Sequence, residues 1–154
     1  SFKEALETLK LLNIDEALNL ARNKGSKILG ICLGMQLLGK SSTEEGFTNG
    51  LNFFDRKVEY FSDNNDVKIP HIGFNSVYSD GSSRLFKNIN TGSDFYFVHS
   101  YRMNINAEDT SHSYCEYGEK FLSSFEFENI FGTQFHPEKS QTNGIKILQN
   151  FLKI

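Results

Sequence analysis

Apolar side chains near both ends of the chain recur with the spacing of amphipathic helices. The first such set contains Phe2, Ala5, Leu6, Leu9 and Leu12, with charged and polar residues between them. Because an α-helix has about 3.6 residues per turn, this spacing predicts a helix across 2–12. A second helix is expected to begin at an Asp15 N-cap and to end at Gly25, and the same spacing returns across Gly144–Ile154.

The middle of the chain has the composition of β-strands. Several segments are rich in β-branched and aromatic residues, and clusters of Gly, Asn, Asp and Ser separate them. These expected strands are Val58–Phe61, Lys68–Tyr78, Asp94–Met103, Ser111–Tyr117, Phe121–Phe127 and Ile130–Phe135. A short apolar run, Lys27–Ile31, predicts one more strand, and a helix follows it from Gly34. The pattern predicts an α/β fold: one domain over 1–154 with a mixed sheet, flanking helices and antiparallel additions.

Length and charge exclude several classes of function. A chain of 154 residues can form one domain with a buried core. The net charge of −3 and the absence of a Lys/Arg cluster argue against nucleic acid or anionic lipid as a partner. The longest apolar run, Ile28–Gly39, is shorter than a bilayer span, and no signal peptide is evident. With only two cysteines no disulfide framework is expected, so these features together predict a cytoplasmic protein.

A Gly-x-Cys-x-Gly run lies at the turn between the Lys27–Ile31 strand and the helix after it. The run is Gly30-Ile31-Cys32-Leu33-Gly34, the thiol analogue of the Gly-x-Ser-x-Gly nucleophile elbow. Small residues on either side of the nucleophile would let strand and helix approach closely. Unpaired N–H groups of the helix favour the thiolate, which predicts a Cys32 pKa below the usual value of about 8.5. The Leu33 N–H would point to a developing oxyanion.

A buried structural cysteine is the alternative interpretation of Cys32, because cysteine is among the most buried residue types. The two flanking glycines argue against it, since an ordinary core strand gains nothing from glycine at both positions. Cys115 lies in a strand-like run without such neighbours and keeps the structural interpretation.

The segment Phe135-His136-Pro137-Glu138 carries the second chemical signal. Proline disfavours a helical conformation at His136, and in extended chain alternate side chains share one face. The Glu138 carboxylate could then accept a hydrogen bond from one imidazole nitrogen and leave the other to act on a nucleophile. A surface turn after a strand is the alternative. The histidines do not show the paired spacing of metal ligands, so neither a metal nor a cofactor is predicted.

The two signals together resemble the signatures of the class I, triad-type glutamine amidotransferases. The matching segments are Gly30–Leu38 and Gly132–Ser140. Two more segments, Pro70–Asn75 and Phe95–Tyr101, are similar to the glutaminase subunits of imidazole glycerol phosphate synthases in histidine biosynthesis. The resemblance covers nearly the whole chain and implies a flavodoxin-like α/β fold.

The resemblance also implies roles for individual residues. Cys32 would be the nucleophile, His136 the base and later the acid, and Glu138 the residue that orients the imidazole. Glutamine would be the substrate, and its expected contacts are Leu33, Gln36, Glu44, Ser100 and Tyr101. Residues expected to lie towards a partner are His71, Phe74 and Lys139. By themselves, Gln36 and Glu44 are more typical of an ordinary polar helix face and loop, and Ser100 and Tyr101 of a strand end. Phe74 is nearly as typical of a core aromatic, and His99 is also typical of a strand histidine bonded to backbone.

The implied partner is a (β/α)₈-barrel cyclase-type subunit, which would receive the ammonia in a heterodimer. The sequence departs from the family pattern in two places. Family members begin with another strand and a Gly-rich loop that supplies a second oxyanion donor, whereas Ser1 starts directly in a helical pattern. We therefore expect this chain to lack its N-terminal strand and loop. Phe74 also stands where this subfamily usually has Trp.

Three alternatives remain open at this point. The same glutaminase chemistry could serve another acceptor, such as a sugar in surface polysaccharide synthesis, and Phe74 leaves room for it. A cysteine hydrolase acting alone, such as a γ-glutamyl hydrolase, is disfavoured by Gln36 and by the partner-facing segments. An inactive fragment that still binds the partner barrel fits the expected N-terminal gap, but the intact Cys32, His136 and Glu138 set argues against it.

Overall fold

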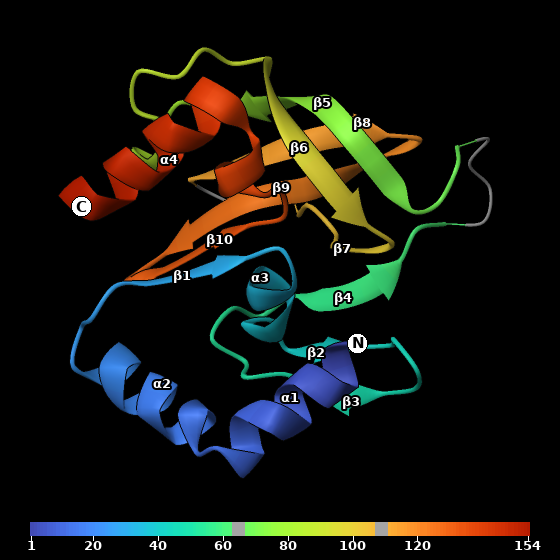
Figure 1. The fold of residues 1–154 in the computed structure, drawn as a ribbon, viewed down its shortest axis with the longest axis vertical. Coiled ribbons are helices and arrows are strands. Elements are labelled where there is room, and N and C mark those ends of the chain that lie inside the picture. Colours follow the sequence, from blue (N-terminus) through green and yellow to red (C-terminus); the bar gives the residue numbers. More distant parts are fainter. Residues whose placement is uncertain (63–66, 107–110) are drawn as a thin grey trace.

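A computed structural model describes residues 1–62, 67–106 and 111–154, which contain two β-sheets with helices around them (Figure 1). The larger, six-stranded sheet has the order β1 (Ile28–Ile31), β10 (Ile130–Thr133), β9 (Glu119–Phe127), β8 (His112–Tyr117), β5 (His71–Ser79) and β6 (Ser93–His99). The smaller, four-stranded sheet has the order β3 (Thr48–Asn49), β2 (Ser41–Ser42), β4 (Lys57–Tyr60) and β7 (Tyr101–Met103). Both sheets are mixed: β1–β10 and β2–β4 are parallel, and the other described pairings are antiparallel.

Helices cover the sheets on two sides. The α-helices are α1 (Phe2–Leu11), α2 (Ile14–Asn23), α3 (Leu33–Leu37) and α4 (Gln141–Lys153), and two short 3₁₀ turns are η1 (Arg84–Phe86) and η2 (Pro137–Lys139). Figure 1 shows α4 against the large sheet near β6, while α1 and α2 lie beyond β1 and α3 on the other side. The predicted α/β class with a mixed sheet and flanking helices is therefore confirmed.

Two clusters of buried apolar side chains form the core. One packs α1 and α3 against the sheets and includes Phe2, Met35 and Phe125. The other lies beneath α4, where Ile147 meets aromatic side chains such as Phe97. Among the described helices none is long and apolar enough to cross a membrane.

The second helix begins two residues earlier than predicted. Its N-cap is Asn13, which has a left-handed backbone with φ 55°, and Asp15 lies inside the first turn. Asparagine tolerates this conformation better than most residues, so the chain can reverse between α1 and α2 within a short turn. Asp15 still interacts favourably with the helix N-terminus, but it is not the cap.

The predicted strand Asp94–Met103 is two strands in different sheets. β6 ends at His99, which is paired with His71 of β5, and β7 begins at Tyr101, which is paired with Tyr60 of β4. The chain thus crosses from one sheet to the other at Ser100. This crossing places the end of β6 and the start of β7 beside the turn that carries Cys32.

Candidate active site

Cys32 occupies a strained turn between β1 and α3. Its φ of 50° and ψ of −109° lie in a region that side-chain-bearing residues rarely adopt. Two backbone hydrogen bonds hold the turn: Cys32 N donates to Thr133 O at 2.7 Å, and Gln36 N donates to Cys32 O at 3.2 Å. The elbow predicted from the sequence is therefore present, seated between the ends of two parallel strands.

Gly30 is required by space, whereas Gly34 is not. A Cβ added at Gly30 would lie 2.6 Å from the Gly34 carbonyl carbon and 2.7 Å from a Leu38 methyl carbon. A Cβ at Gly34 would meet no heavy atom within 4 Å outside its own helix. We expected both glycines to be needed for the close approach of strand and helix, but this holds for Gly30 only. At Gly34 it is the backbone, not the absence of a side chain, that contacts Gly30.

The Cys32 thiol is surrounded by groups from β6 and from the segment after β10. Its Sγ lies 3.8 Å from Val98 O and 3.7 Å from Gln134 Nε2. Burial raises the pKa of the Cys32 thiol above its usual value, and the Leu33 N–H, which favours the thiolate, only partly offsets this. The predicted lowering of this pKa is wrong, because desolvation outweighs the N-terminus of a short helix.

His136 and Glu138 are in direct contact. His136 Nδ1 lies 2.6 Å from Glu138 Oε1, so the carboxylate accepts the Nδ1 hydrogen and leaves Nε2 free to take a proton. The backbone differs from the prediction: His136 is extended, but Pro137–Lys139 forms the η2 turn. Proline suits the first position of a helical turn, and an i,i+2 contact survives in either conformation.

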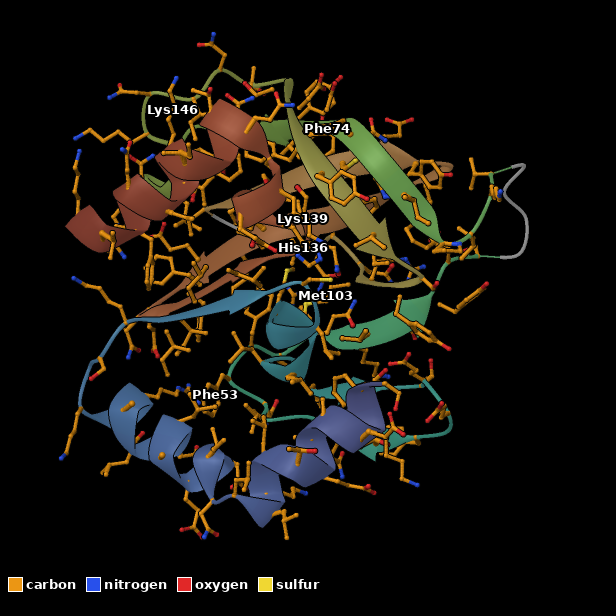
Figure 2. All side chains as sticks on the ribbon, in the orientation of Figure 1. Phe53, Phe74, Met103, His136, Lys139 and Lys146 are labelled. Atoms are coloured by element: carbon orange, nitrogen blue, oxygen red, sulfur yellow. The ribbon has the colours of Figure 1, made fainter. Side chains whose placement is uncertain are left out.

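His136 and Cys32 are anchored to neighbouring positions of β6. His136 N donates to Tyr96 O at 2.9 Å, two residues before the Val98 carbonyl that faces the thiol. Ser140 secures the turn, because its hydroxyl donates to His136 O at 2.6 Å and accepts from Tyr96 N at 2.9 Å. Figure 2 shows His136 and Lys139 on the segment between β10 and α4, near the centre of the molecule.

A pocket of about 250 Å³ opens beside the thiol. Its lining combines the elbow, the loop after β2 and the crossing between β6 and β7, and consists of Ser1, Cys32, Leu33, Gln36, Glu44, Val98, His99, Ser100 and Tyr101. All five residues expected to contact glutamine are among them. His136 and the three expected interface residues are not.

Two of the pocket residues also brace its walls. The buried Gln36 donates from Nε2 to Tyr101 O at 2.9 Å and to Gln134 Oε1 at 3.0 Å. Glu44 accepts a hydrogen bond from Phe2 N at 2.7 Å, which ties the loop after β2 to the start of α1. The role of Gln134, which contacts both Gln36 and the thiol, was missed in the sequence although it lies between Thr133 and Phe135 of the second signature.

The three expected interface residues lie in different surroundings. Phe74 is 49% exposed and packs edge-on against Tyr96, so it is not a core aromatic. Lys139 is exposed and lies over the same Tyr96 ring, with Nζ 5.8 Å from the ring centre. The His71 side chain, by contrast, is only 2% exposed, so it offers almost no surface for contact with a partner.

Comparison with known proteins shows the family of this chain. A family model described as glutamine amidotransferase class-I matches residues 10–154. The chain belongs to this family. The amidotransferase is 45% identical over 156 residues to imidazole glycerol phosphate synthase subunit HisH 1 of Parasynechococcus marenigrum, covering 99% of this chain and 74% of that protein. It is also 45% identical over 157 residues to subunit HisH 1 of Campylobacter jejuni, covering 100% of this chain and 77% of that protein.

A solved structure supports the fold independently of sequence. A glutamine amidotransferase from Thermotoga maritima superposes with a TM-score of 0.64 at 18% identity, over 99% of this chain and 58% of that one. The amidotransferase described here spans about three quarters of the length of the two curated relatives. By family it is an enzyme of the glutaminase type.

Proposed function

We propose that this chain is the glutaminase subunit of an imidazole glycerol phosphate synthase, hydrolysing glutamine and supplying ammonia for histidine biosynthesis. The observation that carries the proposal is the 45% identity, over 99% of the chain, to a subunit of that synthase. The pocket supports it, because Cys32 shares one cavity with every residue expected to contact glutamine.

The first half of the reaction would form a thioester. Cys32 Sγ attacks the side-chain amide carbon of glutamine, and the thiol proton passes to His136 Nε2. Because burial disfavours a free thiolate, we expect proton transfer to accompany the attack. The Leu33 N–H would stabilise the oxyanion of the tetrahedral intermediate. His136 then returns its proton to the amide nitrogen, so that ammonia leaves and a glutamyl thioester remains.

The second half would regenerate the enzyme. Water attacks the thioester carbon and gives a proton to His136 Nε2, and the C–S bond breaks to release glutamate. The same proton then returns to Cys32. Throughout, Glu138 would orient the imidazole and stabilise its charged form, as their 2.6 Å contact allows.

We infer further that ammonia passes to a (β/α)₈-barrel cyclase-type partner. The surface formed by Phe74, Tyr96 and Lys139 supports this inference, since Phe74 is about half exposed and aromatic side chains are enriched at protein interfaces. A Phe74→Ala substitution should weaken binding to the barrel at least about fivefold, because interface aromatics are frequent hot spots. An unchanged Kd would place the interface elsewhere.

Glutamate release tests the proposed reaction. The protein should release glutamate from glutamine, and much faster with the cyclase barrel and its acceptor. The Cys32→Ser variant should abolish this activity. The matched control is Cys115→Ser, since Cys115 is fully buried in β8 and outside the pocket. Full activity of Cys32→Ser, or a glutamine-analogue electrophile attached to Cys115, would refute the assignment of the nucleophile.

A second candidate for the ammonia acceptor rests on Phe74, which stands where this subfamily usually has Trp. The same ammonia could feed a sugar amidotransferase in surface polysaccharide synthesis. Parallel assays with the two kinds of barrel subunit distinguish these acceptors. Stimulation only by a sugar-specific synthase would retain the glutaminase and reject the histidine pathway.

A further inference from the structure

Two buried histidines face each other beside the pocket and have no part in the reaction proposed above. His71 of β5 and His99 of β6 are paired across the large sheet, and His71 Nδ1 lies 3.0 Å from His99 Nε2. The two side chains are 2% and 6% exposed. The His71 ring stacks on Phe97, with centroids 4.8 Å apart, and on Tyr117, at 4.0 Å.

The partners of the pair determine where the hydrogens lie. His99 Nδ1 is 2.8 Å from Tyr101 O, and a carbonyl can only accept, so Nδ1 carries the hydrogen. His99 Nε2 must then accept from His71 Nδ1. His71 Nε2 is left as an acceptor, and Asn75 Nδ2 is 3.5 Å from it. The Asn75 Oδ1 accepts from Ser76 N at 2.8 Å, which leaves the amide nitrogen to face both His71 Nε2 and Glu116 O, the latter at 3.4 Å.

This arrangement satisfies both imidazoles in their neutral forms. Protonation would give His71 or His99 a second N–H that faces another donor. Burial, the largest cause, lowers the pKa of His71 to about 4 and that of His99 to about 3. The pair is therefore a directed chain of hydrogen bonds rather than a titrating site at neutral pH.

The chain of hydrogen bonds ends on the wall of the pocket. Tyr101 O, its last acceptor, also accepts from Gln36 Nε2 at 2.9 Å. Tyr101 is the first residue after the crossing at Ser100, where regular pairing along β6 has stopped. The His99 hydrogen bond thus spans the crossing and adds to the backbone hydrogen bond there, from Phe61 N to Ser100 O at 3.4 Å. Ser100 and Tyr101 line the pocket together with Cys32.

We propose that His71 and His99 are positioning residues that hold the Ser100–Tyr101 corner in the geometry needed to bind glutamine beside Cys32. This inference rests on the proposed glutaminase function. His99 acts directly on the Tyr101 carbonyl, and His71 acts through His99 by supplying the hydrogen bond that keeps its ring in place. Residues that position a substrate can change kcat/KM about 100-fold when a mutation misplaces them by about 1 Å, so a loose corner should weaken productive binding of glutamine.

Kinetics of His99 variants test the proposal in the complex with the barrel. His99→Phe keeps a ring but removes both hydrogen bonds, whereas His99→Asn keeps a donor near the position of Nδ1. We expect His99→Phe to lower kcat/KM for glutamine by about 10- to 100-fold, mainly through KM, and His99→Asn to restore it to within about fivefold of the parent. His112→Phe, the same replacement outside the pair, is the matched control. Equal losses in the Phe and Asn variants would overturn the proposal.

A double-mutant cycle tests the role of His71. If His71 acts through His99, His71→Phe should lower kcat/KM in the parent and have little further effect in His99→Phe. If the two losses in kcat/KM multiply, the residues act separately, and the proposal that His71 acts through His99 is overturned. Circular dichroism of each variant identifies losses that arise from unfolding alone.

Imidazole nitrogen NMR provides a readout that does not depend on activity. At pH 7 both His71 and His99 should be neutral with the hydrogen on Nδ1. An Nε2–H tautomer or a charged ring at either residue would overturn the proposal even in an inactive protein. If the tautomers agree but the parent chain releases no glutamate with any barrel, the proposed function fails and the pair needs a separate test. Labelling of Cys32 by a glutamine analogue provides it: His99→Phe should slow the labelling, and His99→Asn should restore its rate. Equal labelling rates in these two variants would overturn it.

Discussion

Mild acid should destabilise this fold through its buried histidine pair. The pKa of His71 falls from 6.5 to about 4 on folding, and that of His99 falls to about 3, with burial as the main cause in both. For His99, its hydrogen bond to Tyr101 O partly opposes the fall, and the nearby His71, His136 and Arg102 add to it. Between pH 6.5 and these lower values the unfolded chain binds protons that the folded chain does not. The stability that depends on neutral His71 and His99 is therefore fully present above pH 6.5. It is lost progressively as the pH falls from 6.5 towards the folded pKa values of about 4 and about 3.

The magnitude follows from proton linkage. At pH 5.5 an unfolded imidazole with a pKa of about 6.5 is about nine-tenths protonated, whereas the folded one is almost entirely neutral. Each histidine then lowers the free energy of unfolding by about 1.4 kcal/mol relative to pH 7.5, and the pair by about 3 kcal/mol. A domain of this kind is stable by only about 5–15 kcal/mol, so the loss is readily measurable.

Urea unfolding at pH 7.5, 6.5 and 5.5 and constant ionic strength measures this loss. This pH range lies above the one in which carboxylates change the stability. The pKa values of Glu119 and Asp80 are lowered on folding, so their contributions to the free energy of unfolding are lost only at lower pH. His71→Phe should lose about half of the pH dependence, and the double His71→Phe/His99→Phe variant most of it. His112→Gln controls for the loss of an imidazole outside the pair. A parent pH dependence below about 0.5 kcal/mol, or an unaltered one in the double variant, would refute the reasoning.

Three further predictions concern the elbow and the base. Gly30→Ala should lower the free energy of unfolding by about 1–3 kcal/mol, because its Cβ would lie 2.6 Å from the Gly34 carbonyl carbon. Gly34→Ala, whose Cβ would enter open space, should not destabilise the protein. Equal urea midpoints for the two variants would contradict this prediction. Without glutamine, the rate of Cys32 alkylation by iodoacetamide should keep rising with pH beyond the ordinary pKa range of a cysteine thiol, since burial raises the pKa of Cys32. A rate that levels off near neutral pH would show that the helix N-terminus dominates instead. Glu138→Gln should lower kcat for glutamate release on the order of 100-fold with little change in KM, because the carboxylate that orients His136 is lost; a change confined to KM would assign Glu138 to binding.

Local features of the site could be read from the sequence. The Gly30–Gly34 elbow depends on a strand, a turn and a helix that follow one another directly, and each has a short-range pattern. The His136–Glu138 contact was predicted although the expected extended backbone is a 3₁₀ turn. Residues two positions apart remain within reach in both conformations, so the error in backbone did not affect the contact.

The crossing at Ser100 could not be read in the same way. The segment from Asp94 to Met103 is rich in aromatic residues and contains no Gly or Pro, so local preference predicts one strand. The break arises because two distant segments compete for pairing: β5 pairs with the chain as far as His99, and β4 pairs with it from Tyr101. The same crossing brings Ser100 and Tyr101 into the pocket.

Short-range patterns were enough to predict the main helices, the nucleophile elbow and the pairing of His136 with Glu138, because each depends on residues close together in the chain. The burial of His71 against His99 and the raised pKa of Cys32 became evident only from the packing of the folded chain. Burial and desolvation are set by segments that pack from far along the chain. The short-range pattern around a residue contains no measure of them.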